Sequence, residues 1–192
     1  MQDICEKLDK ILPRIKEESF MEGRGLGNEI GYYVFDYEPQ HELLVRDHIE
    51  FIKDKINSRN FDFNIVEFDL YNIMLKILEE KGYLEKTIEM EKRFNKARIL
   101  KATQRTLKLL DDNNLLVQYI TERVEENNIV FLTGVGKAWP IIRSHTVLNN
   151  LHAALDTVPV VMFFPGNYNG AELKLFNEIK DDNYYRAFRL VD

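Results

Sequence analysis

The last third of the chain alternates between strand-like and helix-like sequence, and two glycine turns separate the stretches. Residues 128–133 are mainly apolar and lead into the turn at 134–137, while residues 158–164 form a second apolar run that ends at Pro165-Gly166. We expect a helix after each turn and a closing strand at 183–190. Apolar runs that alternate with amphipathic helices are typical of a parallel sheet covered on both faces. The pattern therefore predicts an α/β fold.

The preceding part of the chain supplies the other elements of this fold. Apolar residues recur every three or four positions in residues 3–20, which predicts a helix that Pro13 kinks or divides. Aromatic and β-branched runs predict strands, and periodic stretches predict helices, in this order: strand 32–36, helix 41–56, strand 63–69 and helix 71–81. The complete prediction is one three-layer, Rossmann-like α/β domain over residues 1–192, with a mostly parallel five-stranded sheet.

Residues 83–126 are highly charged and show no strand pattern. Connections within an α/β unit are usually short, so we expect this segment to be an inserted pair of helices that packs on one face of the sheet. The run Asp111-Asp-Asn-Asn114 predicts the break between the two helices. Asp112 or Asn113 would then be the N-cap of the second helix.

Composition excludes several classes of protein. The formal net charge is −6, which argues against a general affinity for nucleic acid. The single cysteine, Cys5, cannot form an internal disulfide, so an oxidised secreted scaffold is not indicated. No apolar stretch approaches the roughly 18 residues that a membrane span needs, and the amino-terminal residues do not read as a signal peptide. We expect a cytoplasmic protein without membrane contact.

The turn Gly134-Val-Gly-Lys137 has two interpretations. It follows a strand and opens a helix, as a phosphate-binding loop does, but that loop needs the pattern G-x-x-x-x-G-K-[ST]. Here Phe131 replaces the first glycine and Ala138 replaces the hydroxyl residue. A tight strand-to-helix turn is therefore the favoured interpretation. The alternative is a degenerate nucleotide-binding site whose phosphates would be surrounded by Asp36, Gly134, Gly136 and Lys137.

Other catalytic signatures are incomplete. The histidines form the pairs His41/His48 and His145/His152, and the spacing within each pair is wider than in helical metal-binding motifs such as H-E-x-x-H. Ser144 and His145 are neighbours, and neighbours on a helix do not face each other. We therefore assign no catalytic residue, no metal and no cofactor, and an enzyme is the less favoured class.

Polar residues gather at the predicted carboxyl ends of the strands, which is the edge where parallel α/β sheets bind ligands. Asp36 ends the first strand. Asp69 ends the second, where it also suits the N-cap of the next helix. We expect this edge to contact a partner protein, and we define its predicted rim by these residues: Asn28, Glu29, Asp36, Gly134, Gly136, Arg143, His145, Asn149, Tyr168, Tyr185 and Arg186.

A second candidate surface lies in the helical insertion. Residues 92–108 contain seven basic residues and no acidic residue. Four of them recur at three- and four-residue steps and would form a stripe on a helix: Arg98, Lys101, Arg105 and Lys108. Such a stripe suits a phosphate backbone or an acidic protein partner. The simpler alternative is a solvated face that balances an acidic molecule.

Several of these segments together resemble the BrxB family of bacteriophage exclusion (BREX) systems. The resemblance covers nearly the whole chain, and the helical insertion contributes least to it. The segments that carry it are Gly25-Leu-Gly-Asn-Glu29, Tyr33-Val-Phe-Asp-Tyr37 with Pro39, Phe131 to Gly136 with Pro140, Arg143-Ser-His145, Leu148 to Leu151, Phe164-Pro-Gly166 with Tyr168 and Gly170, and Asp182 to Phe188.

The resemblance implies a cytoplasmic accessory protein of antiviral defence. It would act beside a large ATPase, a phosphatase-like protein and an adenine-specific DNA methyltransferase. The family offers no catalytic residues that could be carried over to this chain. The leading hypothesis is therefore a non-catalytic adaptor that binds other BREX proteins through the rim. The alternative is a degenerate nucleotide-binding or DNA-contacting subunit of the same system.

Overall fold

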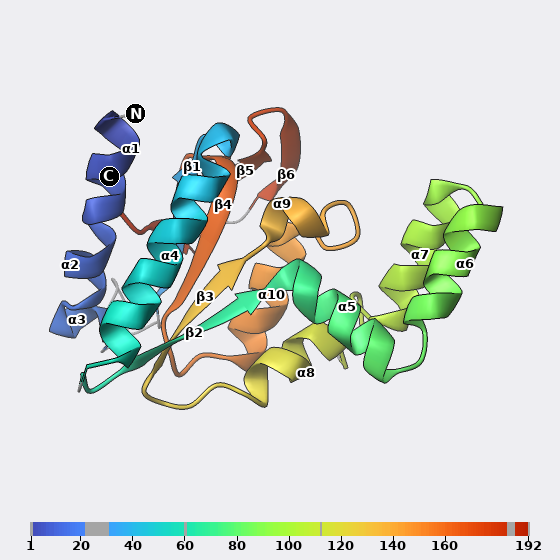
Figure 1. Ribbon diagram of the computed structural model, residues 1–192, viewed down its shortest axis with the longest axis horizontal. Coiled ribbons are helices and arrows are strands. Elements are labelled where there is room, and N and C mark those ends of the chain that lie inside the picture. The colour runs from blue at the N-terminus through green and yellow to red at the C-terminus, as the bar shows by residue number, and fades with distance from the viewer. Residues whose placement is uncertain (1, 22–30, 60, 112, 184–186, 192) are drawn as a thin grey trace.

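A sheet of five parallel strands forms the centre of the computed structural model, which describes residues 2–21, 31–59, 61–111, 113–183 and 187–191 (Figure 1). The spatial order of the parallel strands is β2-β3-β4-β1-β7. Their bounds are β1 (Tyr32–Tyr37), β2 (Asn64–Asp69), β3 (Asn128–Thr133), β4 (Val160–Tyr168) and β7 (Ala187–Arg189). The predicted α/β class with a mainly parallel sheet is confirmed.

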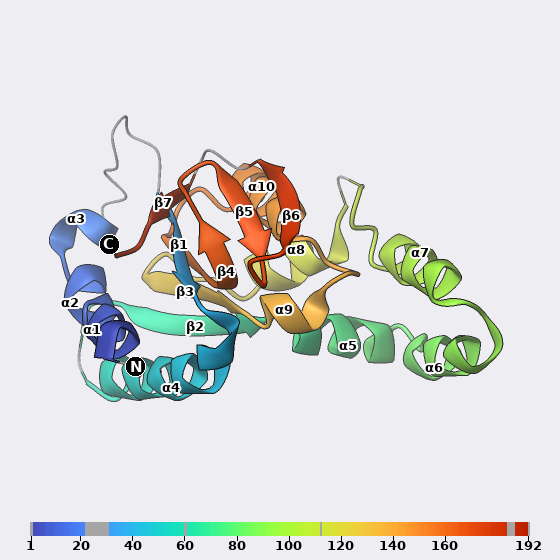
Figure 2. The ribbon, with the colours of Figure 1, turned by 90° about the horizontal axis from the view of Figure 1, so that it is seen from above.

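Helices cover both faces of this sheet and give it two separate hydrophobic cores (Figures 1 and 2). The first core contains the buried sides of α1 (Gln2–Asp9), α2 (Ile11–Ile15), α3 (Glu18–Met21) and α4 (Glu42–Asn57). The second contains those of α5 (Leu70–Glu80), α8 (Leu115–Thr121), α9 (Val135–Ala138) and α10 (Ser144–Ala154). A short 3₁₀ helix, η1 (Pro39–His41), joins β1 to α4.

Successive side chains of each strand point to opposite faces of the sheet, which explains why the two cores stay separate. Val130 and Leu132 of β3 face the second core, and Ile129 and Phe131 face the first. Every residue of β3 is buried, which is typical of a central parallel strand and explains the continuous apolar run in the sequence. The predicted first helix is divided, because α1 ends at Asp9 and α2 begins at Ile11, but the break lies at Lys10 and Pro13 is within α2.

Three predictions for the last third of the chain are wrong. The helix expected after Gly134 is divided into α9 and α10, with a cis peptide bond between Trp139 and Pro140 in the loop that joins them. The second strand does not end at Pro165 but continues as β4 to Tyr168.

In place of the second expected helix, an antiparallel hairpin of β5 (Glu172–Leu175) and β6 (Ile179–Asn183) extends β4. Leu173 and Leu175 are buried and alternate with charged residues, which is the two-residue period of a strand. Gly166 permits the close pairing, since a Cβ atom there would lie 2.2 Å from the carbonyl oxygen of Lys174. The Pro165-Gly166 pair thus lies within a strand, although its sequence is typical of a turn.

The middle segment contains three helices where we predicted a pair. They are α6 (Leu84–Arg93), α7 (Lys96–Thr106) and α8. Helix α8 packs on the second core, whereas α6 and α7 extend away from the sheet (Figures 1 and 2). The N-cap of α8 is Asn114, whose side chain accepts hydrogen bonds from the amides of Leu116 and Val117, and not Asn113. Asp112 lies outside the described residues.

Strand β2 is the outermost strand on one side of the sheet, and a side chain from α4 forms hydrogen bonds with its outer backbone groups. The side-chain amide of Asn57 donates a hydrogen bond to the carbonyl of Ile65 at 2.9 Å. Its carbonyl oxygen accepts one from the Ile65 amide at 2.8 Å. Asn57 therefore pairs with the strand as a neighbouring strand would. None of the helices in the described part of the chain is both long and apolar enough to cross a membrane.

Candidate binding site at the carboxyl edge of the sheet

A cleft of about 570 Å³ lies between α4 and α5, at the carboxyl ends of β2 and β3. We call it the β2–β3 cleft. Its lining is mostly charged or polar, and comprises Arg46, Asp47, Glu50, Glu67, Phe68, Asp69, Asn72, Ile73, Lys76, Tyr119, Thr133 and Gly134. Parallel strands direct their carboxyl ends to the same edge, which brings residues of distant segments together here.

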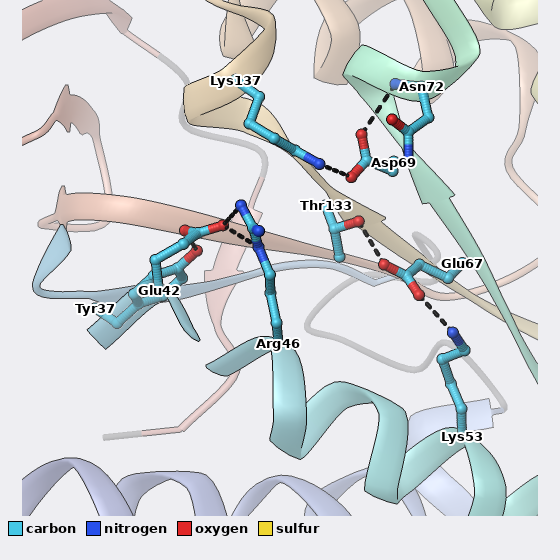
Figure 3. Close-up of polar contacts among 9 residues, drawn as sticks. All are labelled: Tyr37, Glu42, Arg46, Lys53, Glu67, Asp69, Asn72, Thr133 and Lys137. Carbon is cyan, nitrogen blue, oxygen red and sulfur yellow. Dashed lines mark hydrogen bonds and ion pairs between the residues drawn. The ribbon is translucent and has the colours of Figure 1, made fainter. Parts of the chain in front are cut away.

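Glu67 joins α4 to the ends of both strands in this cleft (Figure 3). The Thr133 hydroxyl donates to its Oε1 at 2.6 Å, and Lys53 Nζ donates to its Oε2 at 2.5 Å. Lys53 also contacts Glu50 at 2.8 Å. Burial alone would lower the pKa of Lys53, but hydrogen bonds and attraction from the two carboxylates raise it above the ordinary value. Lys53 is therefore cationic at neutral pH, and Glu67 is neutralised internally.

Asp69 is held in the same way on the other side of the cleft. Its Oδ1 accepts a hydrogen bond from the Asn72 amide at 3.0 Å, which confirms the predicted N-cap of α5. Its other oxygen pairs with Lys137 (Figure 3). Gly134 has a φ of +70°, and a Cβ atom there would lie 2.4 Å from Asp69 Oδ1. Glycine is therefore required by both the backbone and the contact.

The Asp69 carboxylate thus lies against the turn at 134–137, whereas a phosphate-binding loop would offer its free amides to an anion. Helix α9, which begins within this turn at Val135, has only four residues. The charge of Lys137 is already paired with Asp69. These contacts favour the interpretation as a tight strand-to-helix turn.

A third group connects β1 to the start of α4. The Tyr37 hydroxyl donates to Glu42 Oε2 at 2.6 Å, and Arg46 Nε donates to the other oxygen of Glu42 at 2.8 Å (Figure 3). Burial and the adjacent carboxylate raise the pKa of Tyr37 far above its ordinary value. The phenol consequently stays protonated and acts as a donor, which fixes Glu42 beside the cleft.

Asp36, a rim residue that lies one position before the end of β1, is buried below the surface. Lys7 Nζ contacts its Oδ1 at 2.7 Å, and the Tyr168 amide donates to its Oδ2 at 3.0 Å. It borders a smaller hollow of about 230 Å³. Tyr168 is fully buried, with its hydroxyl donating to the Ala187 carbonyl at 2.8 Å, and burial raises its pKa to about 12. The Tyr168 side chain therefore supports the rim from inside, whereas we expected it to be a surface anchor.

Arg143 and His145 meet at one carboxylate that sequence analysis did not identify. Asp181 of β6 contacts Arg143 Nη2 at 2.8 Å and His145 Nδ1 at 2.7 Å. It also accepts a hydrogen bond from the backbone amide of His145 at 3.2 Å. Asp181 is buried, while the Arg143 side chain is 44% exposed. The carboxylate therefore fixes a surface arginine at the start of α10.

The remaining rim residues are dispersed. Gly136 lies against Phe176, whose ring a Cβ atom would approach at 2.9 Å, and Asn149 is exposed on α10. The loop before α10 also exposes Trp139, which sequence analysis did not assign to the rim. The other predicted rim residues lie outside the described residues: Asn28, Glu29, Tyr185 and Arg186.

The predicted basic stripe lies on the projecting helices, away from the residues just described. Arg98, Lys101 and Arg105 are exposed on α7. Lys108 follows the end of that helix and has a φ of 53°. Within the described ranges, no three His, Cys, Asp or Glu side chains are grouped so that they could hold a metal ion.

The fold and the paired charges along its carboxyl edge define the class of this chain as an α/β protein with a mainly parallel sheet and a polar carboxyl edge. A family model, BREX protein BrxB, matches residues 66–190. The chain is 60% identical over 192 residues to BREX protein BrxB of Bacillus cereus (strain H3081.97), and the match covers 100% of both chains. It is 32% identical over 187 residues to BREX protein BrxB of Escherichia coli O9:H4 (strain HS), covering 96% of this chain and 90% of that one.

The chain belongs to the BREX protein BrxB family. The resemblance inferred from the sequence motifs is thereby confirmed, and it makes the chain a BrxB component of BREX phage defence. No solved structure matches it. The family therefore identifies the system, and the geometry of the carboxyl edge is the basis for any more specific role.

Proposed function

We propose that this chain is a non-catalytic adaptor of a BREX phage-defence system and that it binds another protein of that system at the carboxyl edge of its sheet. The observation that carries the proposal is the arrangement of Arg143. Its side chain is 44% exposed, yet Asp181 contacts its Nη2 atom at 2.8 Å. An arginine that is fixed before binding loses little conformational freedom on contact, which favours a role as a binding anchor.

Two further features support a protein partner over a small ligand. Trp139 is 40% exposed in the same loop as Arg143, and tryptophan and arginine are both enriched among residues that dominate protein interfaces. In the β2–β3 cleft, Glu67 and Asp69 are already paired with Lys53 and Lys137. A cleft whose charges are internally neutralised offers shape and hydrogen bonds more than a strong site for one charged ligand.

The partner belongs, on this proposal, to the other BREX components: the large ATPase, the phosphatase-like protein or the DNA methyltransferase. The experiment is a pull-down with the tagged chain from cells that co-express these proteins, at low and high salt. Arg143→Ala should reduce the recovered partner strongly, because loss of an interface anchor costs about 2 kcal/mol or more, or about 30-fold in affinity.

Arg123→Ala is a matched control for this experiment. Arg123 has nearly the same side-chain exposure as Arg143, 43%, and also pairs with a carboxylate, but it lies in the connection from α8 to β3 and is not one of the rim residues. It should retain the partner. A wild-type chain that recovers no BREX protein, or an Arg143→Ala chain that is folded and binds as well as Arg123→Ala, would contradict the proposal.

A further inference from the structure

Helices α6 and α7 form an arm, residues 84–106, that the proposed rim does not use. Figures 1 and 2 show both helices extending together away from the sheet. Among its described residues α6 has no buried side chain, and α7 buries only Thr103. Because hydrophobic stabilisation scales with the apolar area removed from water, helices that bury so little contribute little to the core. A role on the outside of the molecule accounts better for the arm.

The base of the arm is attached to the rest of the protein at defined points. Leu84, at the start of α6, packs against the second core. Gln104 of α7 donates a hydrogen bond from Nε2 to the carbonyl of Ile141 at 3.0 Å. These contacts hold the arm in one orientation, so its outer surface is organised before any partner arrives.

The outer surface of α7 is basic. Arg98, Lys101 and Arg105 are exposed, and Lys108 follows them at the base of the arm. No acidic residue occurs between positions 92 and 110. The chain as a whole has a net charge of −6, so this surface is a local reversal of sign. A local basic surface on an acidic molecule attracts acidic groups that come close to it, because salt screens the attraction at longer distances.

Apolar side chains are interspersed with these charges. One hollow of about 430 Å³ is bordered by Leu110, which is 90% exposed, and by three cations and one carboxylate: Lys101, Arg105, Lys108 and Asp111. A second hollow of about 520 Å³ shares Lys101 and Arg105 and adds Met90 and Arg98. The Arg98 guanidinium lies 4.0 Å from the centroid of the Phe94 ring, which is itself 39% exposed.

We infer that the arm docks an acidic protein segment that carries apolar side chains between its carboxylates. The carboxylates pair with Lys101 and Arg105, and the apolar side chains enter the two hollows, where Leu110 and Met90 line the walls. A nucleic-acid backbone supplies the negative charge but presents no apolar groups to such hollows. This inference goes beyond the rim proposal and does not depend on it.

The test is fluorescence anisotropy with the full-length chain and three labelled probes. The first is a peptide of alternating glutamate and leucine, the second is the same peptide with serine for leucine, and the third is duplex DNA of about 20 base pairs. The glutamate–leucine peptide should bind about tenfold or more tightly than the serine peptide, because only it fills the hollows. Lys101→Glu/Arg105→Glu should weaken its binding by about tenfold or more.

Two control variants make the result specific. Lys16→Glu/Arg59→Glu makes the same change in net charge at exposed positions away from the arm, and it should leave peptide binding unchanged. Leu110→Ser should weaken the glutamate–leucine peptide and not the serine peptide. Arg143→Ala should leave all three probes unaffected, which separates this surface from the rim.

Three results would overturn the inference. The first is DNA binding that is tighter than peptide binding and falls steeply with salt, which would identify a phosphate-backbone surface. The second is equal affinity for the two peptides, or no peptide binding by a folded chain. The third is equal loss in both charge-reversal variants, which would show attraction by net charge alone.

Discussion

Replacing Asp181 by alanine tests whether one buried carboxylate connects β6 to the start of α10. Three contacts are lost in Asp181→Ala. The hydrogen bond from the His145 amide is equivalent to an N-cap and contributes about 1 kcal/mol. The contact with His145 Nδ1 involves side chains only 15% and 8% exposed, and a buried hydrogen bond to a charged group contributes about 1.5–3 kcal/mol.

The contact with Arg143 adds little to stability. Its side chain is 44% exposed, and such surface pairs contribute about 0–1 kcal/mol. We therefore expect Asp181→Ala to lower the free energy of unfolding by about 3 kcal/mol. For a chain of 192 residues this corresponds to a fall in Tm of about 6–12 °C. Arg143→Ala should lower Tm by no more than about 4 °C.

The assay is urea denaturation of both variants beside the wild type, followed by circular dichroism, together with thermal melting. Asp181→Ala should shift the midpoint without a large change in slope, because the unfolded chain exposes nearly the same surface. If Asp181→Ala melts within about 2 °C of the wild type, the carboxylate is not a structural link. If Arg143→Ala unfolds as easily as Asp181→Ala, then Arg143 is structural. A smaller amount of partner recovered with Arg143→Ala in the pull-down would then not be evidence of a binding role.

Two further predictions concern the turn at β3 and the packing of α4. Gly134→Ala should lower the free energy of unfolding by about 2–3 kcal/mol, because alanine disfavours the positive φ and its Cβ displaces the Asp69 cap. Gly82 has the same φ of +70° but open space around its Cβ, so Gly82→Ala should lower it by only about 1–2 kcal/mol. Thermal melts compare the two variants, and equal losses would refute the Asp69 contact. Burial lowers the pKa of His48 below its ordinary value, although a backbone hydrogen bond at Leu8 opposes this shift. Because the pKa of His48 is lower in the folded than in the unfolded protein, neutral His48 favours folding above about pH 6.5, and this contribution is lost as the pH falls. Between pH 7 and pH 5, the Tm of His48→Leu should therefore drop less than that of the wild type. Identical pH profiles of Tm would contradict this prediction.

The strands of the central sheet could be predicted closely from the sequence because burial on both faces leaves a continuous apolar run. The prediction for residues 128–133 matches β3 at both ends. The hairpin β5–β6 could not be predicted in the same way, since Pro165-Gly166 is typical of a turn. Only the close pairing with Lys174 explains why β4 continues through it.

The candidate site was predictable only in its position. A strand end followed by a polar residue indicates the carboxyl edge, as at Asp36 and Asp69, but a single sequence does not specify which distant side chain completes each contact. Thr133 and Glu67 are 66 positions apart, and His145 and Asp181 are 36 apart. Of these partners, Glu67 was the easier to identify from the sequence, since it is a charged residue within an otherwise strand-like run.

The side-chain amide of Asn57 has a consequence for how copies of this chain behave when crowded. Exposed edge strands are templates on which other chains add strands and aggregate. At β2 the amide and carbonyl of Ile65 are already occupied by Asn57, so an incoming strand would first have to displace that side chain. The molecule is thus protected at this part of the β2 edge against the addition of a strand from another copy.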